Sequence, residues 1–355
     1  MNRKGNDGAT LGASLDPTTF TEEPDGASFF ERNTEPRKEI IEGMIRGQQL
    51  VAFAGPFGTG KSPVLADLAM HVLNGIAWCG RAVEQRPVIH VDLETPGSVY
   101  RANLRNIATR LRVSPPTVPD ELDVYLEHDN PDELGTAKLF GVLEMDSDAR
   151  LSLIEAALSQ KPDALVIIDP LELLFRVDTG KKLQILGLYT ELRKLLSRYL
   201  NAALLITFNL RKWGKDGKRP RLLTNPREWL EEVCGTLDIL NRSDVRLGMD
   251  IHDEDVRVLN GIRRAEDMCP LLIRPVTHKD QLAGFGLCPP DDSALEAAFT
   301  PKQMEYWGKL PLKFRFEWIA DGTVPRASLK RLLDRAKSLG LVESNNGLWQ
   351  KRWNR

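Results

Sequence analysis

Eight consecutive residues, Gly55-Pro56-Phe57-Gly58-Thr59-Gly60-Lys61-Ser62, have the spacing G-x-x-x-x-G-K-[ST] of a loop that wraps a phosphate chain. Glycines let backbone N–H groups close on an anion, and the N-terminus of a following helix adds partial positive charge. Lys61 would reach the β- and γ-phosphates of ATP and take part in catalysis, and Ser62 would hold Mg²⁺. The alternative is a glycine-rich turn that binds nothing.

The residue after the loop, Pro63, departs from the usual pattern. We include it in the predicted nucleotide site, but proline has no N–H to offer to the α-phosphate. Because a hydrogen bond to a charged group is worth about 1.5–3 kcal/mol, we expect nucleotide binding to be weaker than usual.

The elements around this loop alternate between strand and helix. An apolar run at residues 49–54 precedes it, and residues 64–73 have apolar positions at helical spacing. Further strands are expected at 86–94, 122–126, 164–169, 203–209, 244–250, 256–262 and 271–276, and helices at 36–46, 99–111, 148–159 and 183–200. Because several strands are almost wholly apolar, we predict an α/β fold with a mainly parallel sheet, covered by helices on both faces.

Carboxylates follow two of these strands. Asp169 ends an apolar run, where an aspartate would order the Mg²⁺ shell. Glu94 ends the strand after the loop's helix and could deprotonate the attacking water, with Asp92 as the alternative base. A turn residue or a helix N-cap is the non-catalytic interpretation of these positions.

Four segments in this order resemble the RepA-like branch of RecA-fold ATPases: Ala54–Ser62, Val91–Pro96, Val166–Leu171 and Thr207–Lys212. That branch includes hexameric replicative helicases of mobile plasmids. The resemblance implies a RecA-like P-loop core, a ring with ATP between subunits, Glu94 as catalytic glutamate and Asp169 as the Mg²⁺ ligand.

Two further positions follow from the resemblance. Asn209 stands where the family usually has a histidine that senses the γ-phosphate, and asparagine donates a hydrogen bond without a positive charge. Arg246 matches the arginine that reaches a neighbouring subunit's ATP, with Arg263 and Arg264 as fallback positions and an exposed strand arginine as the alternative.

A basic, glycine-containing segment follows the last motif. In RecA-like rings the loops at this place contact single-stranded DNA, so we predict DNA contacts by Lys212, Lys215, Lys218 and Arg219. A solvated loop without a partner is the alternative.

The C-terminal segment differs in charge from the rest of the chain. Residues 298–355 contain 12 Lys and Arg against 5 Asp and Glu, whereas the whole chain has a net charge of -2. Helices at 301–307, 314–321 and 325–337, followed by a hairpin at 341–351, resemble a winged helix. Its recognition helix would present Arg326, Lys330 and Arg331 to single- or double-stranded DNA, and docking of a protein partner is the alternative.

The predicted organisation is a disordered or extended tail at 1–35, a RecA-like core at 36–280, a linker at 281–297 and the winged helix at 298–355. Without an apolar run long enough to span a membrane, we expect a cytoplasmic protein that does not bind membranes. The four cysteines lack the spacing of a zinc site. Two functions fit: an ATP-hydrolysing, helicase-like DNA motor, and an ATP-dependent switch or DNA-binding regulator with slow or no hydrolysis.

Overall fold

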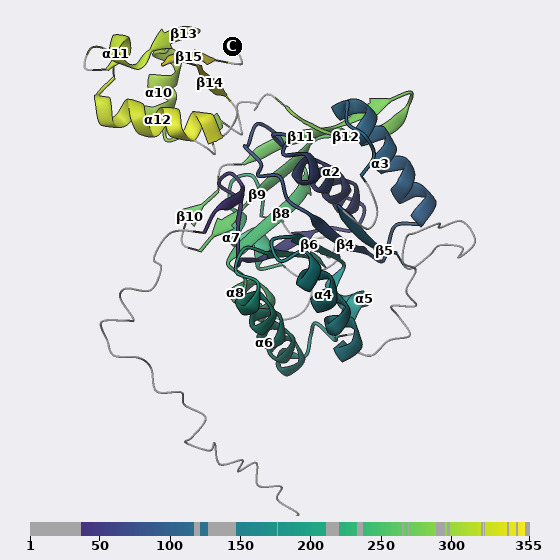
Figure 1. Cartoon of the computed structure of the whole chain (residues 1–355). Helices are drawn as coiled ribbons and strands as arrows, with labels where there is room; N and C mark the ends of the chain where they lie inside the picture. Colours follow the sequence, from purple (N-terminus) through teal and green to yellow (C-terminus); the bar gives the residue numbers. More distant parts are fainter. Residues whose placement is uncertain are drawn as a thin grey trace, which may run out of the picture. The chain divides into compact units, whose positions relative to one another are not determined.

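The computed structural model (Figure 1) describes most of the chain from residue 37 onward. The described residues are 37–116, 121–126, 147–175, 177–210, 220–232, 237–264, 266–268, 270–288, 295–296, 299–320, 322, 324–338, 341–345 and 347–351. The expected tail at residues 1–35 therefore lies outside them.

A ten-stranded sheet organises the nucleotide-binding part of the chain. Its parallel strands, in spatial order, are β5 (Leu122–Leu126), β4 (Val88–Asp92), β6 (Leu165–Asp169), β7 (Ala203–Asn209), β3 (Leu50–Gly55) and β8 (Val245–Ile251). Antiparallel strands β9 (Arg257–Arg263), β11 (Leu271–His278) and β12 (Gln281–Leu287) extend it beyond β8, and the short β10 (Glu266–Asp267) pairs with β9. The sheet is therefore mainly parallel and consistent with a RecA-like core, which confirms the predicted fold class.

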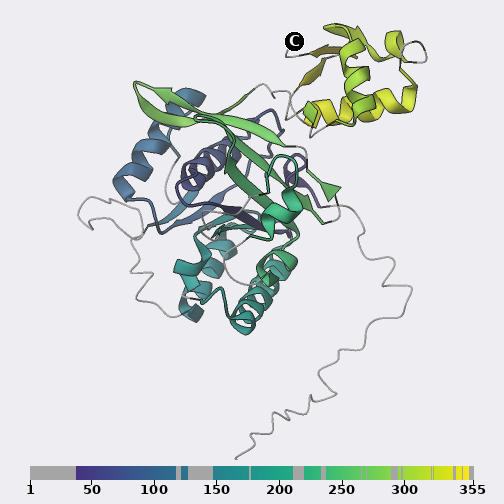
Figure 2. The same cartoon turned by 180° about the vertical axis from the view of Figure 1, so that it is seen from behind.

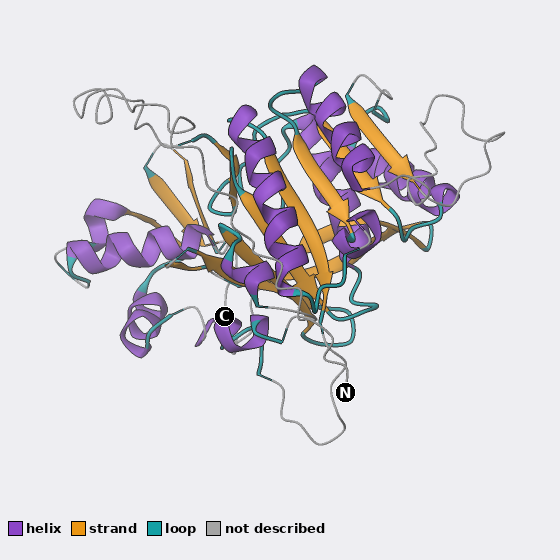
Figure 3. Ribbon diagram, turned by 90° about the horizontal axis from the view of Figure 1, so that it is seen from below, coloured by secondary structure: helices purple, strands orange, loops and turns teal. Residues whose placement is uncertain are grey.

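Helices cover both faces of this sheet, as Figures 1 and 2 show from opposite sides. The helices α2 (Lys61–Asn74) and α3 (Gly97–Leu111) lie on one face. The other face carries α4 (Ser147–Gln160), α5 (Leu171–Phe175), α6 (Lys182–Arg198), α7 (Pro226–Leu230) and α8 (Asp238–Asn241). Figure 3 shows the strands between these layers. Because successive side chains of a strand point to opposite faces, β3 supplies both cores: Leu50 and Ala52 pack on the α6 side, and Val51 and Phe53 on the α2 side.

The segment before β3 is not the helix that its apolar spacing predicts. It forms two short antiparallel strands, β1 (Glu39–Ile41) and β2 (Ile45–Arg46). Gly43 turns between them with a positive φ of 68°, and its N–H donates to the Glu39 carboxylate at 3.1 Å. The apolar residues of this segment are all buried, namely Ile40, Ile41, Met44 and Ile45. Their spacing is therefore compatible with a buried helix face and with the strand pair that the structure shows.

The sheet also continues beyond the expected end of the core. Residues 281–287 form the edge strand β12, which pairs with β11, so the predicted linker at 281–297 starts too early. The division into domains otherwise stays a prediction.

The C-terminal segment has a hydrophobic core of its own, built around Phe314, Leu329, Leu332 and Leu333. Its elements are α10 (Pro301–Lys309), β13 (Lys313–Arg315), α11 (Phe316–Ile319), α12 (Arg326–Ser338), β14 (Val342–Asn345) and β15 (Leu348–Lys351). The sheet order is β13-β15-β14, and β14 and β15 form the expected antiparallel hairpin. The helix expected at 314–321 is instead the strand β13 followed by the short α11.

Candidate nucleotide site

The phosphate-loop sequence connects the end of β3 to the start of α2. Gly58 and Gly60 have positive φ values of 79° and 90°, a conformation that side chains other than glycine rarely adopt. Gly60 directly precedes the first residue of α2, so the turn delivers the helix N-terminus to the loop. Pro63 lies in the first turn, where a proline costs the helix little. The loop thus has the backbone form that an anion site requires.

Lys61 extends over this loop. Its Nζ donates to the carbonyl oxygens of Gly55 at 2.9 Å and Pro56 at 3.2 Å, and to Asn209 Oδ1 at 3.1 Å. Burial lowers the pKa of Lys61, and the nearby carboxylates of Asp169, Glu94 and Glu172 oppose that shift. A cation held among acceptors and carboxylates is ready to exchange these partners for phosphate oxygens.

Asp169 lies at the carboxyl end of β6, paired in register with Asp92 of β4. Its carboxylate is buried and accepts hydrogen bonds from Thr207 Oγ1 and from the side chain of Ser62. Burial, followed by the charge of Asp92, raises the pKa of Asp169. The second oxygen, Oδ2, is buried without a hydrogen-bond partner in the described residues. An orphaned carboxylate oxygen next to a serine hydroxyl is a donor set that fits Mg²⁺.

Glu94 is carried to the same place by the turn after β4. Asp92 Oδ1 accepts the backbone N–H groups of Glu94 at 3.1 Å and Thr95 at 2.8 Å, so it fixes that turn. Asp92 is buried whereas Glu94 is exposed, which leaves Glu94 as the carboxylate that water can approach. Burial of part of its side chain and the charge of Asp169 raise the pKa of Glu94, and Lys61 opposes them. A base with a raised pKa accepts a proton more readily near neutral pH.

Asn209 ends β7 beside the loop, in register with Gly55 of β3. Besides accepting from Lys61, it uses its backbone N–H to donate to the Glu172 carboxylate. The side chain expected to sense the γ-phosphate is therefore in direct contact with the loop lysine.

Two residues at this edge were not singled out from the sequence. Glu172, in the first turn of α5, has a pKa raised mainly by burial, and its Oε2 has no hydrogen-bond partner in the described part of the chain. Its position three residues after Asp169 is the only sequence signal. Arg257, the first residue of β9, donates from Nε to the Thr59 carbonyl at 3.0 Å and so braces the loop. No sequence motif marks it.

The arginines expected to act on a neighbouring subunit lie away from the Lys61 side chain. Arg246 is half-buried on β8, in register with Ala52 in the middle of β3. Burial, then the charge of Arg227, lowers its pKa. Of the fallback positions, Arg263 forms an ion pair with Glu39 at 3.1 Å, and Arg264 lies 3.8 Å from Asp244.

The predicted DNA-binding residues fall into two groups. Lys212, Lys215, Lys218 and Arg219 lie outside the described residues. Arg326, Lys330 and Arg331 are exposed on α12, whose opposite face is buried through Leu329, Leu332 and Leu333. The structure thus leaves the α12 basic side chains accessible without showing what they bind.

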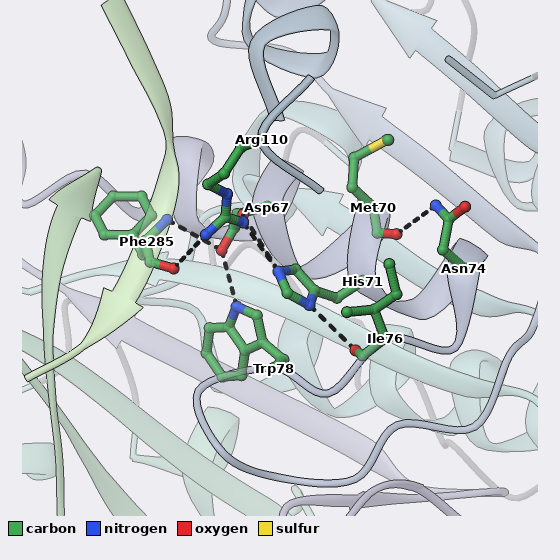
Figure 4. A network of polar contacts seen from close by, with 8 residues as sticks. All are labelled: Asp67, Met70, His71, Asn74, Ile76, Trp78, Arg110 and Phe285. Carbon is green, nitrogen blue, oxygen red and sulfur yellow. Dashed lines mark hydrogen bonds and ion pairs between the residues drawn. The ribbon is translucent and has the colours of Figure 1, made fainter. Parts of the chain in front are cut away.

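A buried polar network anchors the loop's helix to the elements beside it (Figure 4). Asp67 of α2 accepts from Trp78 Nε1 at 3.0 Å, from the Phe285 N–H at 3.2 Å and from Arg110 Nη2 at 2.5 Å. Arg110 also contacts Nε2 of His71 at 3.0 Å, and the other ring nitrogen lies 3.1 Å from the Ile76 carbonyl. Burial raises the pKa of Asp67 to about 6 and lowers that of His71 to about 4. The network ties α2 to α3 and β12 and so fixes the position of Lys61.

The described residues contain neither a metal-binding cluster of side chains nor a membrane-spanning helix. No cluster of three or more His, Cys, Asp and Glu side chains in them could hold a metal by itself. In the same residues, no helix combines the length and the apolar character needed to cross a bilayer.

A match to a protein-family model agrees with the nucleotide-site geometry. The family model described as an AAA domain, AAA_25, matches residues 17–214, which is more than half of the chain and includes Lys61, Glu94, Asp169 and Asn209. Among solved structures, a KaiC-like protein of Pyrococcus horikoshii has 14% sequence identity and a TM-score of 0.44 over 72% of this chain and 99% of its own. A search of curated proteins found no match.

Proposed function

The chain belongs to the AAA_25 family of AAA domains and is a P-loop ATPase, and from this premise we propose that it hydrolyses ATP and couples hydrolysis to DNA. The proposed role is a helicase-like or replication-associated motor of a mobile element, in the RepA-like branch that the sequence motifs resemble.

The observation that carries hydrolysis is the meeting of Lys61, Asp169 and Glu94 at one edge of the sheet. Lys61 would bind the β- and γ-phosphates, and Glu94 would take a proton from the water that attacks the γ-phosphorus as the bond to the β–γ bridging oxygen breaks. Ser62 and Asp169 would hold Mg²⁺, which supplies charge neutralisation for the phosphates. The Asn209 amide would donate to the γ-phosphate.

The action on DNA rests on the basic C-terminal segment. Its element order of helix, strand, helix, helix and hairpin resembles that of a winged helix, and Arg326, Lys330 and Arg331 are accessible on α12. The basic segment that contains Lys212 and Lys215 would add contacts to single-stranded DNA.

A hexameric ring belongs to the same proposal. Arg246 lies away from the Lys61 of its own chain, which suits an arginine that acts on a neighbour's ATP. Analytical ultracentrifugation with and without ATP tests this assembly, and a monomer under both conditions would contradict it.

An ATP-dependent switch with slow or no hydrolysis is the second candidate. It is favoured by Pro63, which lacks an N–H for the α-phosphate, and by the neutral Asn209, which stands where the resembled family usually has a histidine that senses the γ-phosphate.

Steady-state ATP hydrolysis, measured with and without single-stranded DNA at low and moderate salt, separates the two. For the motor we expect a rate that rises with DNA and disappears in Lys61→Ala and Glu94→Gln. If ATP binds to the wild type but turnover is negligible with and without DNA, the switch is the function.

A further inference from the structure

A polar cavity lies at the edge of the sheet opposite the phosphate loop. Its volume is about 680 Å³, which is within the range of small-ligand sites. It is lined by Arg37, Arg46, Gly47, Gln48, Gln49, Arg193, Leu196, Ser197, Asp244, Arg263 and Arg264. We call it the arginine cavity.

The arginine cavity is strongly positive. Five arginines line it, and among the described residues ion pairs join them to the carboxylates of Asp244 and Glu39. Both carboxylates are shared: Asp244 Oδ2 also accepts the Leu50 N–H at 2.9 Å, and Glu39 also accepts the Gly43 N–H at 3.1 Å. Within the described part of the chain, the five guanidinium groups of the cavity therefore outnumber the two carboxylates that form ion pairs with them.

Two arginines of the cavity, Arg37 and Arg264, have the weakest ion pairing with carboxylates. Arg37 forms no ion pair within the described residues, and the Arg264 side chain is 81% exposed with its closest carboxylate atom 3.8 Å away. Guanidinium groups present planar pairs of donors that match the oxygens of a phosphate.

Backbone conformation also sets this cavity apart. Gln48 and Arg264 both have left-handed φ values, 64° and 52°, although neither is glycine. Such conformations persist only where the surrounding structure enforces them, and they cluster at binding sites. Here hydrogen bonds enforce them, because the Gln48 N–H donates to Ala202 and the Arg264 N–H to Asp244.

The arginine cavity is distinct from the phosphate loop of the same chain. Gln48 and Gln49 precede β3, whereas the phosphate loop follows it. A strand rises about 3.3 Å per residue, so the six residues of β3 separate the two sites by about 20 Å.

We propose that the arginine cavity binds phosphate groups of a second ligand, other than the ATP held by the phosphate loop of the same chain. The phosphates can come from a nucleic-acid backbone or from a free phosphorylated compound. This inference does not depend on the proposed coupling of hydrolysis to DNA.

The test uses the full chain saturated with ADP, so that every phosphate loop, including a neighbour's, is filled. One arm titrates a fluorescent oligo-dT 20-mer by anisotropy, and the other titrates pyrophosphate by calorimetry. The variant is Arg37→Gln combined with Arg264→Gln, and the matched control is Arg105→Gln, which removes an exposed arginine from α3. Thermal unfolding of each variant checks the fold.

We expect the double variant to weaken binding at least tenfold and the control less than twofold. If the double variant weakens only the binding of oligo-dT, the phosphates come from a nucleic-acid backbone. The slope of log K against log salt should then be smaller in magnitude by about 1.4 in the double variant, for two lost phosphate contacts. If pyrophosphate binding responds, the cavity takes free phosphates. Equal affinities of wild type and double variant, or no binding of either probe by the wild type, would overturn the proposal.

Discussion

Replacing Arg257 by glutamine tests whether the phosphate loop depends on a brace from β9. In the structure the Arg257 Nε donates to the Thr59 carbonyl at 3.0 Å. A charge-assisted hydrogen bond is worth about 1.5–3 kcal/mol when buried, but Arg257 is half-buried and water replaces part of it. We therefore expect a loss of about 1–1.4 kcal/mol in nucleotide binding, which is a fivefold to tenfold rise in Kd.

Calorimetric titration with ADP measures this effect. Arg257→Lys keeps the charge but not the Nε donor, so it should fall between wild type and Arg257→Gln. Arg274→Gln removes an exposed arginine from the neighbouring strand β11 and should bind ADP like the wild type. An ADP affinity of Arg257→Gln within twofold of the wild type, with unchanged thermal stability, would refute the reasoning.

Three further predictions concern the α2 network and Glu94, the proposed catalytic base. Trp78→Phe removes the buried hydrogen bond to Asp67 and should lower the free energy of unfolding, measured by urea denaturation, by about 2 kcal/mol. The control Trp318→Phe changes a side chain that is 66% exposed and should leave the free energy of unfolding unchanged. Equal losses of stability in the two variants would contradict this prediction. The pKa of His71 is about 4 in the folded state, below its unfolded value of 6.5, so protonation of His71 lowers the free energy of unfolding as the pH falls from about 6.5 to 4. His71→Gln lacks this titration, so its free energy of unfolding should fall by about 3 kcal/mol less than that of the wild type over the same pH range. Parallel pH profiles of the free energy of unfolding for wild type and variant would contradict this prediction. Because the pKa of Glu94 is raised, the acid limb of the hydrolysis rate should lie above the pH expected for an ordinary glutamate; a limb near pH 4.5 would count against Glu94 as the base.

Local sequence patterns predicted the strand ends well. Short apolar runs ending in Asp169 or Asn209 indicate buried parallel strands whose carboxyl ends meet at one edge of the sheet, and the structure places them there. The roles of these residues stay predictions.

Other features depend on tertiary contacts that no local pattern encodes. The apolar spacing of residues 36–46 fits a helix and a strand pair equally well, and the Gly43 turn decides for the strands. Arg257 reaches the phosphate loop from a strand 198 residues further along the chain. Glu172 acts on the charge of Lys61 because α5 begins beside that lysine, and this proximity is not encoded in the local sequence.

The central position of β3 limits how nucleotide binding can be communicated. It is hydrogen-bonded in parallel register to β7 on one side and β8 on the other. A shift of β3 by one residue relative to its neighbours would turn its buried side chains to the opposite faces of the sheet, so β3 cannot transmit nucleotide binding by sliding along its own axis. A conformational change at the phosphate loop must instead be transmitted through side-chain contacts to the neighbouring strands, such as those of Arg257 on β9 and Asn209 on β7. Substitutions of these two side chains would therefore uncouple the rest of the molecule from nucleotide binding.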